Sequence, residues 1–197
     1  TTNGMVVDSA GYNVSVATVL ENAEGQAGAV TKKGAGTLTL AAARNATGPV
    51  SVLGGTLVAS NGLAVAAGTS RIDGTLTLTS ANRLTVGAGA ALAGTGTVDR
   101  VTLDDYAVFA RAKADNAVAP LSISSGVANN HLTVALTGYS LMELRTPVAL
   151  LRSPTAFIDV SKVTVTLDGQ ANSHLTAKVV EVGGQQVLYA SYSSGTM

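Results

Sequence analysis

One short phrase, in which apolar and hydroxyl-bearing residues alternate, returns along the first half of the chain at an almost constant interval. The phrase is Gly-Thr-Leu, which begins at Gly36, Gly55 and Gly74 in equal steps, and a looser copy begins after a similar step at Gly94. Such alternation is typical of a strand that buries one face. A period of about 20 residues is too short for a helical-hairpin repeat. The pattern therefore predicts an all-β fold, a β-solenoid with about 20 residues per coil.

A solenoid makes a specific prediction about which side chains stack. Equivalent positions in successive coils lie about 4.8 Å apart, the spacing of paired strands. We expect Leu38, Leu57 and Leu76 to form a column inside the solenoid, with the threonine before each leucine on the outer face. If the whole chain coiled with this period, it would make roughly ten coils.

The pattern changes after about residue 120. The Gly-Thr-Leu phrase disappears, the alternating runs lengthen, and the last two, at 174–182 and 185–192, are joined by Gly183-Gly184. Two alternating runs joined by a Gly-Gly pair predict an antiparallel hairpin. A solenoid needs a different last element, because an open coil exposes unpaired backbone groups. We expect solenoid coils over residues 1–120, and the last coils with C-terminal capping strands over residues 121–197.

Composition narrows the classes of function. Lysine plus arginine and aspartate plus glutamate number 12 each, so the net charge is zero and no long-range field favours nucleic acid. Aromatic residues make up only 4% of the chain, and aliphatic side chains must therefore fill the core. There is no cysteine, which excludes disulfides and thiolate metal sites. No apolar run approaches the roughly 18 residues of a membrane span, and we expect no cofactor and no metal.

Residues 33–40 read Lys-Gly-Ala-Gly-Thr-Leu-Thr-Leu, and a turn from Asn45 to Gly48 and a second Gly-Thr-Leu strand at Gly55 follow. This stretch resembles the passenger-associated transport repeat, also called the autotransporter-associated β-strand repeat. The match covers about residues 32–57, with weaker echoes to residue 98. It departs from the usual pattern at Ala46 and Thr47, where an aromatic residue commonly stands. The resemblance implies a right-handed parallel β-helix in the exported passenger of a Gram-negative surface protein.

The function that this resemblance implies is structural and non-enzymatic. The chain would be a β-helix stalk on the bacterial cell surface, and its folding would support translocation across the outer membrane. Together with the predicted cap, this leads us to expect folding coil upon coil from a C-terminal seed. The residues expected to carry the repeat are Lys33, Gly34, Gly36, Thr37, Leu38, Leu40, Asn45, Gly48, Gly55, Thr56, Leu57, Gly74, Thr75 and Leu76.

Two other classes of function remain open. One is an adhesin-like module that binds a host glycan or host surface protein, although aromatic residues are few. The other is a polysaccharide-degrading β-helix enzyme, against which the few charges count. Self-association at the solenoid ends is a further expectation.

The densest charged stretch of the chain is a candidate binding or catalytic site. Acidic and basic residues on one face of a β-helix could bind calcium and an acidic sugar, as in a polysaccharide lyase. The simpler interpretation, which we favour, is a solvated loop between coils and cap, because neighbouring strand residues such as Asp104 and Asp105 point to opposite faces. The residues of the stretch are Arg100, Asp104, Asp105, Tyr106, Arg111, Lys113 and Asp115.

The remaining candidates are isolated histidines, tyrosines and asparagines. His131 and His174 each begin an alternating run and have no acidic residue at ligand spacing, which favours exposed strand starts. Three tyrosines near the cap could stack on a sugar, although we favour Tyr189 plugging the end of the core together with Phe157. Those tyrosines are Tyr139, Tyr189 and Tyr192. Asn13 and Asn45 fit the glycosylation pattern, which we read as coincidence.

Overall fold

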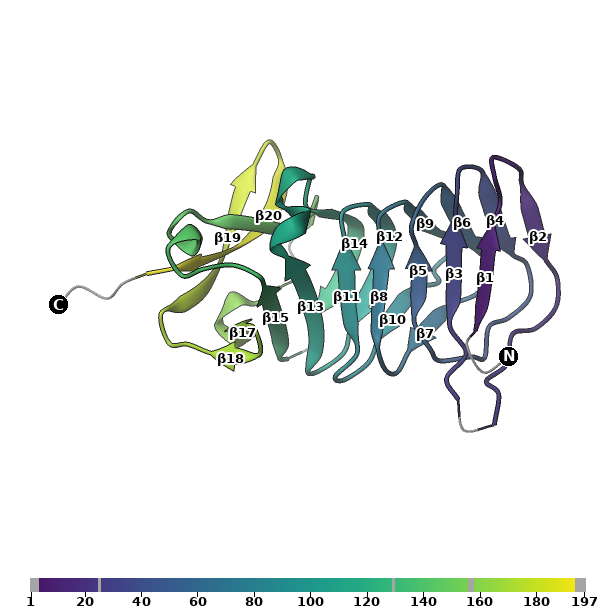
Figure 1. Ribbon diagram of the computed structural model, residues 1–197, viewed down its shortest axis with the longest axis horizontal. Coiled ribbons are helices and arrows are strands. Elements are labelled where there is room, and N and C mark those ends of the chain that lie inside the picture. Colours follow the sequence, from purple (N-terminus) through teal and green to yellow (C-terminus); the bar gives the residue numbers. More distant parts are fainter. Residues whose placement is uncertain (1–3, 25, 129, 156–157, 194–197) are drawn as a thin grey trace.

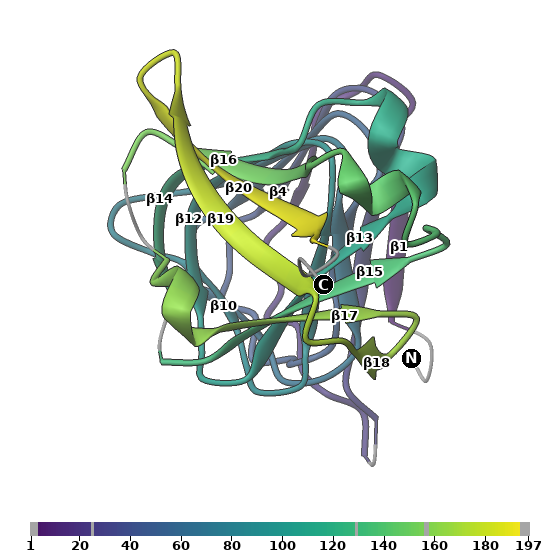
Figure 2. The ribbon, with the colours of Figure 1, turned by 90° about the vertical axis from the view of Figure 1, so that its left-hand side faces the viewer.

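The computed structural model describes residues 4–24, 26–128, 130–155 and 158–193. The chain is all-β, with parallel strands stacked into a solenoid of about six turns of about 22 residues each (Figure 1). Viewed from the C-terminal end, the chain winds counter-clockwise as it approaches the viewer, which makes the solenoid right-handed (Figure 2). Both the predicted fold class and its hand are confirmed.

Every coil contributes a strand to each of two long sheets, called sheet A and sheet B. The strands of sheet A are parallel until the last pair. They are β1 (Met5–Asp8), β3 (Val30–Lys33), β5 (Val50–Val52), β8 (Thr69–Ile72), β11 (Ala91–Gly94), β13 (Ala107–Ala112), β15 (Leu132–Thr137), β17 (Val163–Leu167) and the antiparallel β18 (Gln170–Ala171).

Sheet B follows the same order on the other side of the core, and its last two strands are antiparallel. Its strands are β2 (Val14–Val16), β4 (Thr37–Leu40), β6 (Thr56–Ala59), β9 (Thr75–Leu78), β12 (Thr97–Leu103), β14 (Leu121–Ala128), β16 (Val148–Ser153), β20 (Gln185–Tyr192) and β19 (Leu175–Val182). Two short strands, β7 (Leu63–Val65) and β10 (Leu84–Val86), pair in parallel beside the second half of β12.

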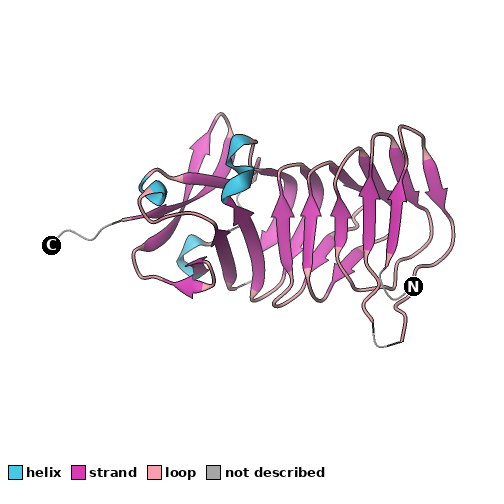
Figure 3. Cartoon of the chain, in the orientation of Figure 1, coloured by secondary structure: helices cyan, strands magenta, loops and turns pink. Residues whose placement is uncertain are grey.

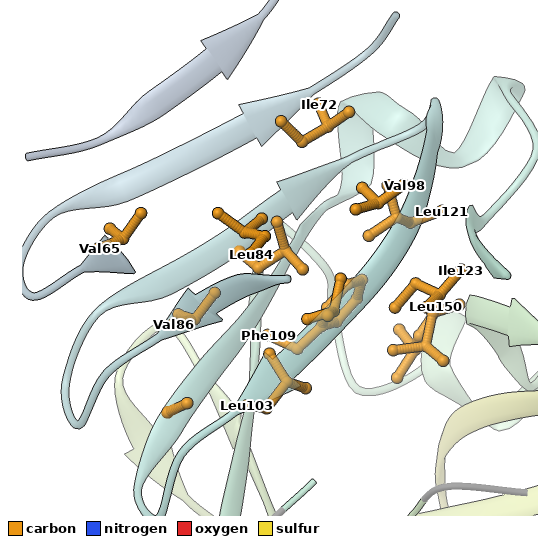
Figure 4. Close-up of a cluster of buried hydrophobic side chains, with 14 of the residues drawn as sticks. Val65, Ile72, Leu84, Val86, Val98, Leu103, Phe109, Leu121, Ile123 and Leu150 are labelled. Carbon is orange, nitrogen blue, oxygen red and sulfur yellow. The ribbon is translucent and has the colours of Figure 1, made fainter. Parts of the chain in front are cut away.

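The predicted leucine column is present. Leu38 pairs with Leu57, and Leu57 pairs with Leu76, and all three side chains are fully buried. The column continues through Val98 to Ile123. The preceding threonines pair with one another in the same register and lie half-buried on the outer face. Figure 4 shows a cluster of buried hydrophobic side chains in which the core continues toward the C-terminal coils.

The step between coils is not constant, and this corrects the expected number of coils. The step from Leu76 to its partner Val98 is longer than the steps before it, and the step from Val98 to Ile123 is longer still. In sheet A, the chain makes an even longer excursion between the paired residues Leu136 and Leu167. The added residues form longer corners, which include the short 3-10 helices η1 (Lys113–Ala117), η2 (Glu143–Arg145) and η3 (Val160–Lys162). Figure 3 shows these three helices gathered in the C-terminal half.

The two ends of the stack differ. At the C-terminal end, β19 and β20 form the predicted antiparallel hairpin through Gly183-Gly184, and β20 pairs antiparallel with β16. Leu188 of β20 is buried against the last coil. At the N-terminal end, β1 and β2 each begin a sheet and have a strand on one side only among the described residues. Within the described ranges, a hairpin therefore caps the last coil, and the stack begins with the coil of β1 and β2.

Candidate functional site

The glycine of the repeated phrase forms a column of its own at the corner that leads into sheet B. The Gly36 carbonyl accepts a hydrogen bond from the Thr56 backbone N–H at 3.0 Å, and Gly55 and Gly74 repeat this contact one coil later each time. A Cβ on Gly74 would lie 2.4 Å from the Gly55 carbonyl oxygen. Only glycine permits so close an approach of two backbones.

The register of this glycine column shows that the expected start of the fourth copy of the phrase, Gly94, is wrong. Thr97 pairs with Thr75, so that Gly96, rather than Gly94, lies over Gly74. The step into the fourth copy is therefore longer than the repeated phrase indicated. In the first coil a side chain takes the place of the glycine carbonyl, because Asn13 Oδ1 accepts from the Thr37 N–H at 3.2 Å. Asn13 thus has a role in closing the first coil.

Of the two adjacent lysines, Lys33 is exposed and Lys32 is fully buried. Strand β3 alternates, so that Val30 and Lys32 point into the core. The Lys32 ammonium donates to the carbonyls of Lys33 and Gly34, both at 2.7 Å, and of Gly54 at 3.2 Å. A buried charge is tolerated where backbone oxygens satisfy it, so the ammonium joins the corner glycines of two coils.

A second buried cation, Arg44, immediately precedes the predicted turn residue Asn45. Its guanidinium donates to the carbonyls of Gly28, Gly48 and Ala64, at 2.7, 2.6 and 3.0 Å, and so ties together turns of three coils. Burial lowers the pKa of Arg44 to about 10, which leaves it charged at neutral pH. Asn45 itself is exposed, and its amide donates to Glu21 Oε1 at 2.8 Å. Sequence reasoning did not identify Arg44.

The third buried cation is Arg111, which belonged to the predicted charged stretch. It lies 2% exposed at the end of β13, and its Nη2 donates to the carbonyls of Asp115 and Val118 at 2.8 and 3.2 Å. A cavity of about 390 Å³ lies beside it. The cavity is lined by Arg111, Asn116, Val118, Pro120, Glu143, Thr146, Pro147, Val148 and Ala149.

The other charges near this cavity form ion pairs with one another. Arg71 Nη2 lies 2.6 Å from Asp115 Oδ1, and Lys113 Nζ lies 2.6 Å from Glu143 Oε1. Arg71 holds the pKa of Asp115 below its usual value. Lys113, together with hydrogen bonds from Ser140, lowers the pKa of Glu143 to about 2. These four charges thus compensate one another in pairs, whereas Arg111 donates to backbone carbonyls.

The structure divides the predicted charged stretch instead of assembling it. Strand β13 separates Asp105 and Tyr106, in the turn before it, from Arg111 at its end. Arg100 lies in β12, where its guanidinium donates to the Leu78 carbonyl at 2.9 Å. The arrangement expected of a calcium and acidic-sugar site is not brought together. Among the described residues, no three or more His, Asp or Glu side chains are grouped so that they could hold a metal ion.

We predict that Asp115→Asn lowers the free energy of unfolding by about 2 kcal/mol at neutral pH, because two charge-assisted hydrogen bonds with Arg71 are weakened. The native pKa of this carboxyl lies below its usual value. Its contribution is therefore complete above the ordinary pKa of an aspartate and is lost as the pH falls through the lower native pKa. Urea unfolding should show a difference between variant and wild type that disappears in strong acid. A constant difference would contradict the prediction, and the exposed Glu24→Gln is the control.

The two histidines lie in unrelated surroundings. His131 is exposed at the start of β15, with Nδ1 3.0 Å from Asp105 Oδ1 and its ring stacked on Tyr106. His174, also exposed, meets Tyr192 edge to face, with ring centroids 5.8 Å apart. Both positions agree with the expected exposed strand starts, but the ring partner of each was missed.

The three tyrosines near the cap do not form one surface. Tyr139 is buried, and its hydroxyl donates to Asn116 Oδ1 at 2.5 Å. Tyr192 packs against the core from the edge of the hairpin. Tyr189 lies on the opposite face of β20 from Leu188, half-buried beside Lys178, and therefore does not plug the core as expected. Phe157 lies outside the described residues.

No protein-family description, curated protein or solved structure matches this chain. Within the described ranges, no helix is long and apolar enough to cross a membrane.

Proposed function

We propose that this chain is a structural, non-enzymatic segment of an exported bacterial surface protein, a β-helix stalk whose folding supports passage across the outer membrane. The observation that carries the proposal is the antiparallel hairpin that seals the last coil of a stack of parallel coils. The resemblance of residues 32–57 to the passenger-associated transport repeat adds support.

The C-terminal hairpin gives folding a direction. The hairpin brings together residues close in sequence, since β19 and β20 are joined by two glycines, and such local pairs form early. Each further coil then buries its column on a surface that already exists, as in other repeat proteins. A chain whose C-terminal part leaves a pore first would be prevented from sliding back by the coils already folded outside.

The buried cations support a structural use of the charges. Lys32, Arg44 and Arg111 each donate to backbone carbonyls at the corners between coils. Arg71, Asp115, Lys113 and Glu143 are paired with one another. These charges hold corners and loops together, which is the role expected of a rigid spacer.

The test is display of the whole chain as the passenger of an outer-membrane carrier, scored by protease access on intact cells. Leu188→Asp places a charge beneath the cap, where Leu188 is 1% exposed, and should lower display several-fold. Leu38→Asp perturbs the far end of the stack and should lower display less. Thr176→Asp, on the exposed face of the hairpin, is the control. Equal display of all variants, or a larger defect in Leu38→Asp, would contradict the proposal.

A further inference from the structure

We propose that the free face of the Tyr106 ring is a stacking site for a neutral pyranose ring of a glycan. Tyr106 lies in the turn between β12 and β13, and its side chain is among the most exposed of the large hydrophobic residues, at 59%. This inference goes beyond the stalk proposed above and does not depend on it.

The backbone of Tyr106 is the first observation. The Ala107 N–H donates to the Asp104 carbonyl at 2.9 Å, which closes a turn whose third residue, Tyr106, has a φ of 63°. Such a position favours glycine or asparagine, and a bulky residue there is strained. Backbone strain in a non-glycine residue often accompanies a functional role.

The preceding coil provides an internal comparison. There the Ala90 N–H closes the same turn on Gly87, and the third residue is Gly89, with a φ of 72°. The Gly89 N–H donates to the Tyr106 carbonyl at 2.9 Å, which places the two residues one above the other. One coil therefore has the glycine that the turn favours, and the next has an exposed aromatic ring in its place.

The ring of Tyr106 has one face covered by another ring. It stacks on His131 of the following coil, with centroids 4.9 Å apart and planes within 1°. Asp105 holds His131 in turn, since its Oδ1 accepts from the His131 backbone N–H at 2.7 Å and lies 3.0 Å from Nδ1. The two rings thus stack along the axis of the solenoid, and the other face of the Tyr106 ring is directed toward the coil that contains Gly89.

The coil of Gly89 leaves room for a ring. A Cβ placed on Gly89 would meet no atom within 4 Å, and the neighbouring Ala88 has only a methyl group. A flat ring stacked on Tyr106 would therefore lie at the level of Gly89 and extend the column that His131 and Tyr106 begin. Aromatic rings offer such flat, weakly polar faces.

The groups at this corner favour a sugar over an aromatic side chain of a protein as the partner of Tyr106. The side chain of Asp105 is 43% exposed beside the ring, so that a carboxylate can accept hydrogen bonds from hydroxyl groups. Oδ1 of Asp105 already accepts from the His131 N–H, and Oδ2 is the oxygen that would accept from a hydroxyl group of the sugar. On the open side lie Ala88 and Gly89, which are small and exposed and offer little apolar surface to cover an aromatic side chain of a protein.

The experiment is an NMR titration of the full chain with neutral methyl pyranosides, namely glucosides, galactosides, mannosides and N-acetylglucosaminides. We expect at least one to shift the amide signals of Tyr106 and Gly89. Tyr106→Gly should weaken that binding by about tenfold or more, because the stacking surface is lost. Tyr12→Ala, which removes another exposed tyrosine in the first coil, should leave the binding unchanged.

Measurements of thermal stability distinguish a binding role of Tyr106 from a packing role. Since glycine suits the backbone at this position, Tyr106→Gly should melt at the same temperature as wild type or higher. A lower melting temperature in the absence of sugar binding would assign Tyr106 to the packing of His131 and overturn the proposal. Binding that persists in Tyr106→Gly would do the same. Shifts produced by arginine methyl ester and by none of the sugars would show a cationic partner and also overturn it.

Discussion

A Leu57→Asp variant of the full chain should lose about 4 kcal/mol or more of its free energy of unfolding. Leu57 is fully buried between Leu38 and Leu76 in the column under sheet B. An aspartate there would leave a carboxyl group without polar partners, and it would also remove the contacts of a buried leucine, a change that by itself costs about 2–5 kcal/mol when a smaller residue replaces it. Folded domains are stable by only about 5–15 kcal/mol.

The form of the unfolding curve is as informative as its midpoint. Coils of a solenoid contact only their neighbours, and a charge in one coil uncouples the coils on its two sides. We therefore expect urea unfolding, followed by circular dichroism, to separate into two transitions in Leu57→Asp, with the capped C-terminal coils unfolding last.

Thr56→Asp is the matched control for this variant. Thr56 is the adjacent residue of β6, and its half-buried side chain lies on the outer face between Thr37 and Thr75. A carboxylate there reaches water, so that the change should stay within about 0.5–1 kcal/mol. If the two variants lost equal stability, the leucine column would not be what holds the coils together.

The leucine column and the cap could be predicted from the sequence because both depend on short-range patterns. Alternation fixes which residues face inward, and the constant step of the repeated phrase places Leu38, Leu57 and Leu76 in register. The hairpin could also be predicted, because Gly183-Gly184 joins two alternating runs that pair directly. Local period and turn chemistry were sufficient for both.

The number of coils and the fourth copy of the phrase could not be predicted in this way. Beyond Leu78 the corner before β10 lengthens, and the next phrase is in register at Gly96 and not at Gly94. Further corners hold η1 and η2, whose lengths no period specifies. A solenoid tolerates such insertions, because a loop between two strands does not alter their pairing.

The burial of the three cations could not be predicted from the sequence for a different reason. A pattern of apolar and polar positions assigns Lys32, Arg44 and Arg111 to the surface, because lysine and arginine are seldom buried without partners. Their partners here are backbone carbonyls of neighbouring coils, such as Gly54 for Lys32 and Ala64 for Arg44. Those contacts exist only once the coil lengths are known. The stacking of Tyr106 on His131 could not be predicted for the same reason, because the two residues belong to successive coils.

A Gly74→Ala variant should be destabilised by about 2–3 kcal/mol, although it adds only one methyl group. The new Cβ would lie 2.4 Å from the Gly55 carbonyl oxygen and 3.1 Å from the Gly54 carbonyl carbon. The Gly55 oxygen cannot move freely, because it accepts the hydrogen bond of the Thr75 N–H at 2.9 Å. Relief of the clash would separate β6 from β9 at the start of the sheet B ladder.

Gly74 is the informative member of the glycine column because its backbone, unlike that of Gly55, does not have a positive φ. Any loss of stability in Gly74→Ala therefore reports the contact between coils and not a strained backbone. Gly62→Ala is the control, since its Cβ would meet only the Arg83 carbonyl oxygen at 3.5 Å, and alanine there should be neutral or stabilising by up to about 1 kcal/mol. Equal unfolding midpoints for the two variants in urea would show that coils can separate at this corner without cost, and the glycine of the repeated phrase would then need another explanation.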